Sequence, residues 1–120
     1  MFASHRYEGE LIRATSELDQ ARDQAERARA LAKADAMRTD NEFRSAKERL
    51  TSLESRLLPE AEKVTEAAEF AYRKGATGLL ELLDARRTLR QIQQEAAMAK
   101  SDYAKALVAM RSQSASGAAK

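Results

Sequence analysis

The glycines Gly75 and Gly78 constrain the fold most, because they hold the only turn in a chain that is otherwise patterned for helix. Apolar residues at helical spacing run up to this glycine pair, and leucines at the same spacing resume at Leu79. Two long helices joined by so short a turn run antiparallel. The sequence therefore predicts an all-α fold, a long antiparallel helical hairpin of the coiled-coil type.

The composition agrees with this fold and excludes other classes. Of the 120 residues, 33% are charged and 5% are aromatic, with one Pro and no Cys, which is typical of long helices and excludes a β-rich domain. The net charge of +2 is spread over both signs and does not indicate a nucleic-acid binder. Residues 1–6 lack the features of a secretory signal, and no apolar stretch reaches the length of a membrane span. Neither an export signal nor a span is predicted in this chain.

The first helix is predicted over residues 8–74. Its apolar stripe slips by one turn at Ala36 and has an average repeat slightly above 3.5 residues, so we expect a straight helix with little supercoil. Pro59 either begins a new helix at its first turn or lies inside a continuous one and bends it, and we expect the bend. The remaining stripe residues are Leu11, Ala14, Leu18, Ala21, Ala25, Ala28, Ala32, Phe43, Ala46, Leu50, Leu53, Leu57, Val64, Ala67 and Ala71.

The second helix is predicted over residues 79–111 after a tip at 75–78, and residues 112–120 are expected to form a disordered tail. It is half as long as the first helix, so it can cover only about residues 41–74. The stripe over residues 11–32 is left without a partner in this chain, and neighbouring subunits or a missing part of the polypeptide should cover it. The second stripe is Leu82, Ala85, Leu89, Ile92, Ala96, Ala99, Tyr103, Ala106 and Met110.

The reactive side chains indicate no enzyme, no cofactor and no metal site. The single histidine, His5, precedes the predicted helix without clustered donors, and an exposed imidazole is the better interpretation. No Ser or Thr has a His nearby to activate it. At the tip we expect a left-handed cap at Gly75, an N-cap at Thr77 and a favourable first-turn charge at Glu81.

Charged and aromatic residues crowd the tip. The basic residues there allow a nucleic-acid contact, but a solvated face with intersubunit salt bridges is favoured, because no aromatic residues interleave as a base-stacking platform requires. Tyr72 is expected to pack, with a latch through its hydroxyl as the minority alternative. Along the helix surfaces we expect ion pairs such as Asp40 with Arg44 and Glu69 with Arg73. The basic residues are Arg73, Lys74, Arg86, Arg87 and Arg90.

Four segments in register resemble the C-terminal repeat of TolC-like outer-membrane efflux proteins, closest to the heavy-metal, CzcC-like branch. The resemblance covers about residues 7–111. By it, residues 1–7 look like the stub of a preceding strand or loop, and Gly9-Glu10 resembles the start of the long helix that follows. The segments are Leu58-Pro59-Glu60-Ala61-Glu62, Ala71-Tyr72-Arg73-Lys74-Gly75, Leu82-Leu83-Asp84-Ala85-Arg86-Arg87-Thr88-Leu89 and Asp102-Tyr103-Ala104-Lys105-Ala106-Leu107.

The resemblance implies one hairpin of a trimeric α-barrel that crosses the periplasm of a Gram-negative bacterium. The complete protein would be a homotrimer anchored in the outer membrane by a β-barrel whose strands are missing from this chain. It would dock through a periplasmic adaptor protein to an inner-membrane pump, exporting heavy metals or drugs, with no nucleic acid involved. The adaptor would dock on the tip residues Tyr72, Gly75, Ala76, Thr77 and Gly78. Glu81 and Asp84 would form an acidic ring at the aperture. Arg86 and Arg87 would form intersubunit salt bridges.

The chain departs from the pattern of this family in two ways. Some relatives carry an arginine at the position of Thr77 that is used in latching the tip, and this chain lacks that arginine. Because the strands and the first repeat are absent, the chain is expected to be a fragment, a truncated reading frame or an excised piece that forms no pore unaided. The alternative function is a free-standing soluble coiled-coil scaffold or adaptor hairpin, which explains the apolar stripes equally well but the unmatched first half less well.

Overall fold

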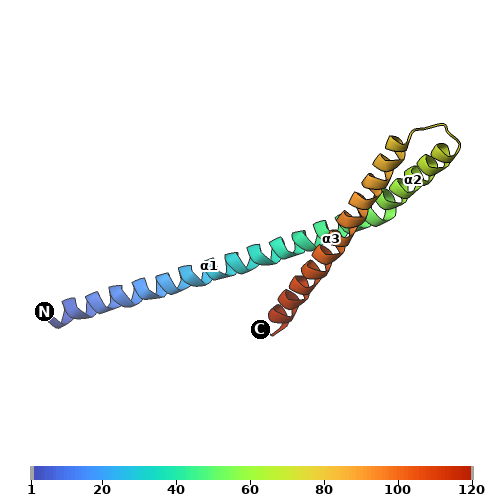
Figure 1. The fold of residues 1–120 in the computed structure, drawn as a ribbon. Helices are drawn as coiled ribbons and strands as arrows, with labels where there is room; N and C mark the ends of the chain where they lie inside the picture. The colour runs from blue at the N-terminus through green and yellow to red at the C-terminus, as the bar shows by residue number, and fades with distance from the viewer. Residues whose placement is uncertain (1, 120) are drawn as a thin grey trace. The chain divides into compact units, whose positions relative to one another are not determined.

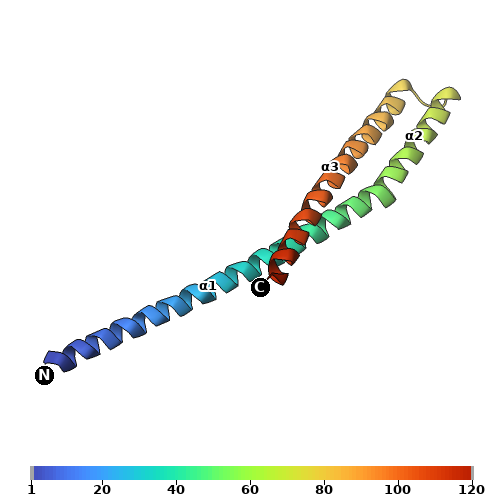
Figure 2. The same ribbon diagram turned by 90° about the horizontal axis from the view of Figure 1, so that it is seen from below.

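The computed structural model describes residues 2–119 of the chain as helices connected by a single turn (Figure 1). Helix α1 spans Phe2–Ser52, the π-helical turn η1 spans Leu53–Leu57, helix α2 spans Leu58–Arg73 and helix α3 spans Leu79–Ala118. No strand occurs among the described residues. Helix α3 packs against α2 and η1, and Figures 1 and 2 both show it running back beside them. The predicted all-α antiparallel helical hairpin is confirmed.

The chain divides into two compact units, Met1–Arg38 and Thr39–Lys120. The first unit contains only the beginning of α1, and every residue from Ala3 to Arg38 is exposed. Leu11 and Leu18 on the predicted stripe are each about half exposed, at 50% and 51%. Among the described residues, the predicted stripe over residues 11–32 is thus exposed along its whole length, as expected.

The second unit holds the helical hairpin and its core. Leu53, Ala96 and Ala99 are buried together, and Leu50, Leu57 and Ile92 pack against them. Two of the three central residues are alanines, so the two helices can approach closely at this level. Nearer the tip, Ala61, Thr65 and Leu82 are also buried.

The predicted stripe of α3 is the face that packs against the other helix. All nine of its residues are buried or half-buried, and half-buried Gln113 continues the same spacing beyond Met110. An uninterrupted heptad pattern therefore located this side of the core correctly.

Pro59 lies inside a continuous helical path, as predicted, but the helix accommodates it by a π-helical turn that the sequence did not predict. The N–H of Leu58 donates a hydrogen bond to the carbonyl of Leu53, five residues earlier, and the flanking residues keep right-handed helical dihedral angles. Pro59 has no N–H, and its ring would clash with the carbonyl four residues before it. One wider turn relieves this clash. In Figure 2 the ribbon of the second unit changes direction here.

The π-helical turn changes which face of α2 is buried. The predicted stripe residue Val64 is 60% exposed and Ala67 is also exposed, whereas Thr65 is buried and Ala68 is half-buried. A π turn holds one residue more than an α turn, so these two positions of the buried face move one residue along the sequence, whereas Ala71 is half-buried as predicted. The predictions of Val64 and Ala67 as core residues were therefore wrong.

Ion pairs and a ring contact connect α3 with the facing helical segments α1, η1 and α2 within the second unit. Arg49 lies 3.8 Å from Asp102, Lys100 lies 3.3 Å from Glu54, and Arg86 lies 3.1 Å from Glu69. The Phe43 and Tyr103 rings stand 5.6 Å apart between centroids. Such exposed ion pairs contribute at most about 1 kcal/mol each, so they specify the register more than they stabilise the hairpin.

Two surface pairings predicted within a helix have different outcomes. Arg44 and Asp40 form the expected ion pair at 2.8 Å. Glu69, expected to pair with Arg73, pairs instead with Arg86 of α3. Arg86 approaches from the facing helix, and its Nε and Nη2 atoms both lie within hydrogen-bonding distance of one carboxylate oxygen. Pairing across the hairpin replaces pairing along one helix.

The observed helices extend farther than predicted toward both ends of the chain. Helix α1 begins at Phe2 instead of near residue 8, and α3 continues to Ala118 instead of ending near residue 111. Neither stretch contains Pro, and alanine, the strongest helix former, recurs at Ala115 and Ala118. The Ser114 hydroxyl donates to the carbonyl of Met110 within the helix. Among the described residues, the strand-like stub and the disordered tail are both replaced by helix.

Candidate functional site: the hairpin tip

Helix α2 ends in a Schellman motif centred on Gly75. This glycine has a φ of +75°, the only positive φ among the described residues. Its N–H donates to the carbonyl of Tyr72 at 3.0 Å, and the N–H of Ala76 donates to the carbonyl of Ala71 at 2.9 Å. These two bonds satisfy carbonyls that the helix end would leave unpaired. The left-handed cap predicted at Gly75 is confirmed.

Helix α3 begins without a side-chain cap. Its N-cap residue is Gly78, with φ −80° and ψ 167°, and no side-chain hydrogen bond closes the first turn. The prediction of Thr77 as N-cap was wrong, because the helix starts at Leu79 and the capping position is the residue immediately before it. The Thr77 hydroxyl oxygen is shielded from solvent and has no hydrogen-bond partner among the described residues. Glu81 lies in the first turn, as predicted.

An exposed apolar cluster, consisting of Leu79, Leu80 and Leu83, surrounds the start of α3. Leu80 is 78% exposed, and Leu79 and Leu83 are about half exposed. These leucines were not among the surface residues predicted from the sequence. The available signal was that Leu80 and Leu83 lie outside the heptad stripe of Leu82 and Ala85.

Tyr72 and Phe70 add aromatic surface just before the turn. They are 43% and 58% exposed, so neither is a packing residue of the hairpin core. Lys74 places its ammonium 5.6 Å from the centre of the Phe70 ring, an exposed cation–π contact that contributes about 0.5–1 kcal/mol. Tyr72, which was expected to pack, therefore keeps a substantial exposed surface among the described residues.

The remaining site residues lie along the first turns of α3. Glu81 and Asp84 are both exposed and sit three residues apart on one helix face. The Arg86 guanidinium is already engaged by Glu69 of its own hairpin, which leaves it less available for a neighbouring subunit. Arg87 is exposed and forms no ion pair with any described residue. The turn thus brings the residues predicted to dock a partner and the acidic residues to one end of the hairpin.

Two shallow grooves run beside the contact between α2 and α3. One is lined by Leu57, Val64, Ala85 and Ile92, among others, and the other by Glu69, Leu83, Arg86 and Leu89, among others. Both grooves are open to solvent and lie on the hairpin below the tip. Helical side chains of a neighbour could pack into grooves of this kind.

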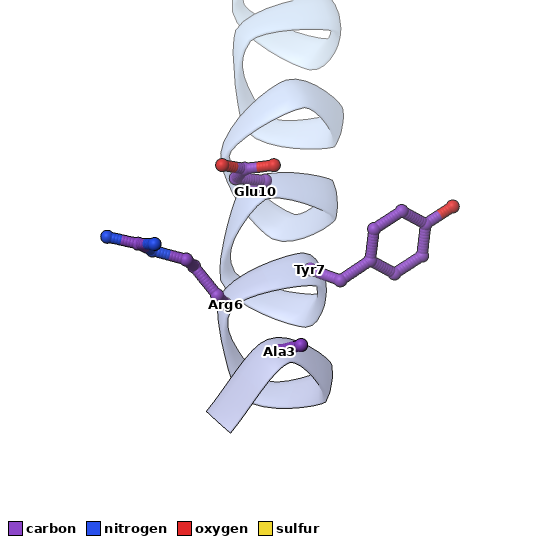
Figure 3. A pocket seen from close by; sticks show the side chains of 4 residues that line it. All are labelled: Ala3, Arg6, Tyr7 and Glu10. Carbon is purple, nitrogen blue, oxygen red and sulfur yellow. The ribbon is translucent and has the colours of Figure 1, made fainter. Parts of the chain in front are cut away.

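A third hollow, near the beginning of α1, is no binding site. Ala3, Arg6, Tyr7 and Glu10 line it, and Figure 3 shows the Arg6 and Tyr7 side chains pointing to opposite sides of the helix. All four residues come from one helix, so they enclose no cavity. Within residues 2–119, no group of three His, Asp or Glu side chains is placed to hold a metal ion.

Comparisons with known proteins supply no assignment for this chain, so any assignment rests on its own residues. In the described part of the chain, no helix has both the length and the hydropathy needed to cross a membrane. No family model, no curated protein and no solved structure matches this chain.

Proposed function

We propose that this chain supplies one α-helical hairpin of a TolC-like outer-membrane efflux channel. The observation that supports the proposal is the position of the resembling segments on the hairpin. Residues 58–62 begin α2, residues 71–75 form its Schellman cap, residues 82–89 lie in the first turns of α3, and residues 102–107 include half-buried Tyr103 and Ala106 of its packing face. In this proposal the complete protein is a homotrimer that spans the periplasm and exports heavy metals or drugs with a pump.

The tip is the proposed docking site for the periplasmic adaptor. Its turn residues Gly75, Ala76 and Gly78 are exposed, and Tyr72 and Leu80 add apolar surface beside them. An exposed apolar cluster at the end of a rigid hairpin suits insertion against another helical hairpin, because burial of the leucines would contribute most of the affinity.

Adaptor docking predicts a position-specific cross-link. A photo-reactive amino acid at Ala76 of the complete protein, expressed with its adaptor, is expected to cross-link to the adaptor on irradiation. The same group at Gln93, an exposed residue of α3 away from the tip, serves as the control. Cross-linking from Gln93 alone, or from neither position, would show that the tip is not the docking site.

We further propose that Glu81 and Asp84 line the channel aperture. In a threefold assembly these exposed residues would form two stacked acidic rings beyond the turn. Six carboxylates around one lumen attract cations and hinder anions. Arg87 has no ion-pair partner among the described residues and is available to hold the closed state by pairing with a neighbour.

Single-channel recording of the complete trimer tests the acidic rings and the channel together. The double variant Glu81→Gln and Asp84→Asn is expected to lose most of its cation selectivity and its block by polyvalent cations. Glu60→Gln with Glu62→Gln, exposed carboxylates farther from the tip, is the matched control. Unchanged selectivity would remove these residues from the aperture, and a complete protein without conductance would favour a free-standing coiled-coil scaffold instead.

A further inference from the structure

The first unit carries an apolar helix face that no other described residue covers. This free face consists of eight residues at heptad spacing, and its largest members, Tyr7, Leu11 and Leu18, are 65%, 50% and 51% exposed. A helix of this kind draws most of its stability from burying such a face. We infer that a second copy of this chain covers the free face, forming a symmetric antiparallel dimer. The eight residues are Tyr7, Leu11, Ala14, Leu18, Ala21, Ala25, Ala28 and Ala32.

The sizes of these side chains favour an antiparallel pairing. The large residues lie in the first half of the free face and the second half is entirely alanine. When two copies run in opposite directions, each large side chain meets an alanine, so the helices can stay at one separation along the whole contact. The facing pairs are Tyr7 with Ala32, Leu11 with Ala28, Ala14 with Ala25 and Leu18 with Ala21.

A parallel pairing lacks this match. Leu11 and Leu18 would each face their own copies, while four successive layers from Ala21 onward would bring alanine against alanine. Straight helices cannot be far apart at the leucines and close together at the alanines. Voids along half of the contact would forfeit dispersion energy.

The flanking charges select one antiparallel register. In the register above, Glu8 lies opposite Arg29 of the second copy, and this attraction occurs twice by symmetry. A slip of one heptad in one direction places Arg22 opposite Arg22, and a slip in the other direction places Glu17 opposite Glu17. The first slip brings only like charges together, whereas the second also places Glu8 opposite Arg22. Side-chain size therefore favours the antiparallel orientation, and the register above pairs opposite charges without a like-charge pair.

This inference goes beyond the proposed function and does not depend on it. In the proposed channel, other segments of the assembly would cover the same face, whereas in the free chain a second copy takes their place. A monomeric free chain would leave the channel proposal untouched, and failure of the channel proposal would leave the dimer untouched.

Cysteine cross-linking of the full 120-residue chain tests the orientation. The chain contains no Cys, so introduced thiols form the only disulfides. A mixture of the Leu11→Cys and Ala28→Cys variants is expected to give a disulfide-linked dimer on mild oxidation, while each variant alone gives little. Efficient cross-linking of Leu11→Cys with itself would indicate a parallel dimer and overturn the inference.

Sedimentation tests whether the free face forms the dimer. The unmodified chain is expected to sediment as a dimer, and Ala25→Glu, which faces Ala14 of the second copy, should weaken dimerisation by roughly 100-fold. Ala30→Glu is the matched control, because it adds the same charge on the opposite face of the helix. A monomeric unmodified chain, or equal loss from both substitutions, would contradict the inference.

Discussion

Replacing Ala99 by Glu is expected to abolish the packing of α3 against the facing helix in the second unit. Ala99 is 1% exposed and lies with Leu53 and Ala96 at the centre of the core. A glutamate at this position must either bury a charge without a partner or push the helices apart. We expect a loss of at least ~3 kcal/mol in the free energy of unfolding, which corresponds to a fall of roughly 12 °C or more in the Tm.

Thermal unfolding followed by far-ultraviolet circular dichroism measures this effect, at one protein concentration for all variants because association raises apparent stability. Ala97→Glu is the matched control, since Ala97 lies two residues away on the exposed face of the same helix. Its Tm should change by only a few degrees. Similar transitions for the Ala99 and Ala97 variants would mean that the hairpin core does not form around Ala99.

Replacing Gly75 by Val is expected to produce the second large effect. Gly75 has a φ of +75°, which a β-branched residue adopts only at a cost of about 1–3 kcal/mol. A Cβ atom at this position would meet no heavy atom within 4 Å, so the cost comes from the backbone alone. Loss of the left-handed conformation would also break the hydrogen bonds that close the end of α2.

The matched comparisons use the same loop. Gly75→Asn should retain most of the stability, because asparagine tolerates the left-handed region. Gly78→Val should cost less than Gly75→Val, since Gly78 has extended dihedral angles that valine accepts. Urea unfolding at fixed protein concentration compares the three variants, and equal midpoints for Gly75→Val and Gly78→Val would rule out a conformational role for Gly75.

The cap at Gly75 also links stability to the proposed docking role. A valine there would disturb the backbone beside Ala76, whereas a substitution at Leu80 would leave the backbone intact, because that side chain is 78% exposed. Loss of adaptor binding through Leu80→Ser without loss of Tm would therefore separate docking from folding.

Local sequence patterns were sufficient for much of this architecture. The spacing of Gly75 before Leu79 predicted the turn and the left-handed cap, because few residues other than glycine adopt a positive φ at a helix end. The heptad stripe from Leu82 to Met110 predicted the buried face of α3, since no proline or glycine interrupts it. The candidate tip residues came from the same turn.

The first helix was harder to predict, because one local event changed the buried face of the turns that follow it. Pro59 indicated a disturbance, but whether the helix stops, bends or widens depends on the packing of neighbouring side chains. Here it widens by one residue at Leu53–Leu57, and Thr65 takes the buried place predicted for Val64. The Thr65 hydroxyl donates to the carbonyl of Ala61 and lies 3.3 Å from that of Ala85, so this polar residue is satisfied inside the hairpin.

By itself, the sequence determined that this chain forms two helices joined at Gly75 and that the stripe over residues 11–32 stays exposed among the described residues, because periodicity, turn chemistry and helix length are local properties. The tertiary structure alone decided the pairing of Glu69 with Arg86 and the burial of Thr65. Those features depend on how the facing helices are rotated and aligned. One extra residue in a helical turn rotates the residues that follow it by about 100°, which is why Thr65 and not Val64 lies against α3.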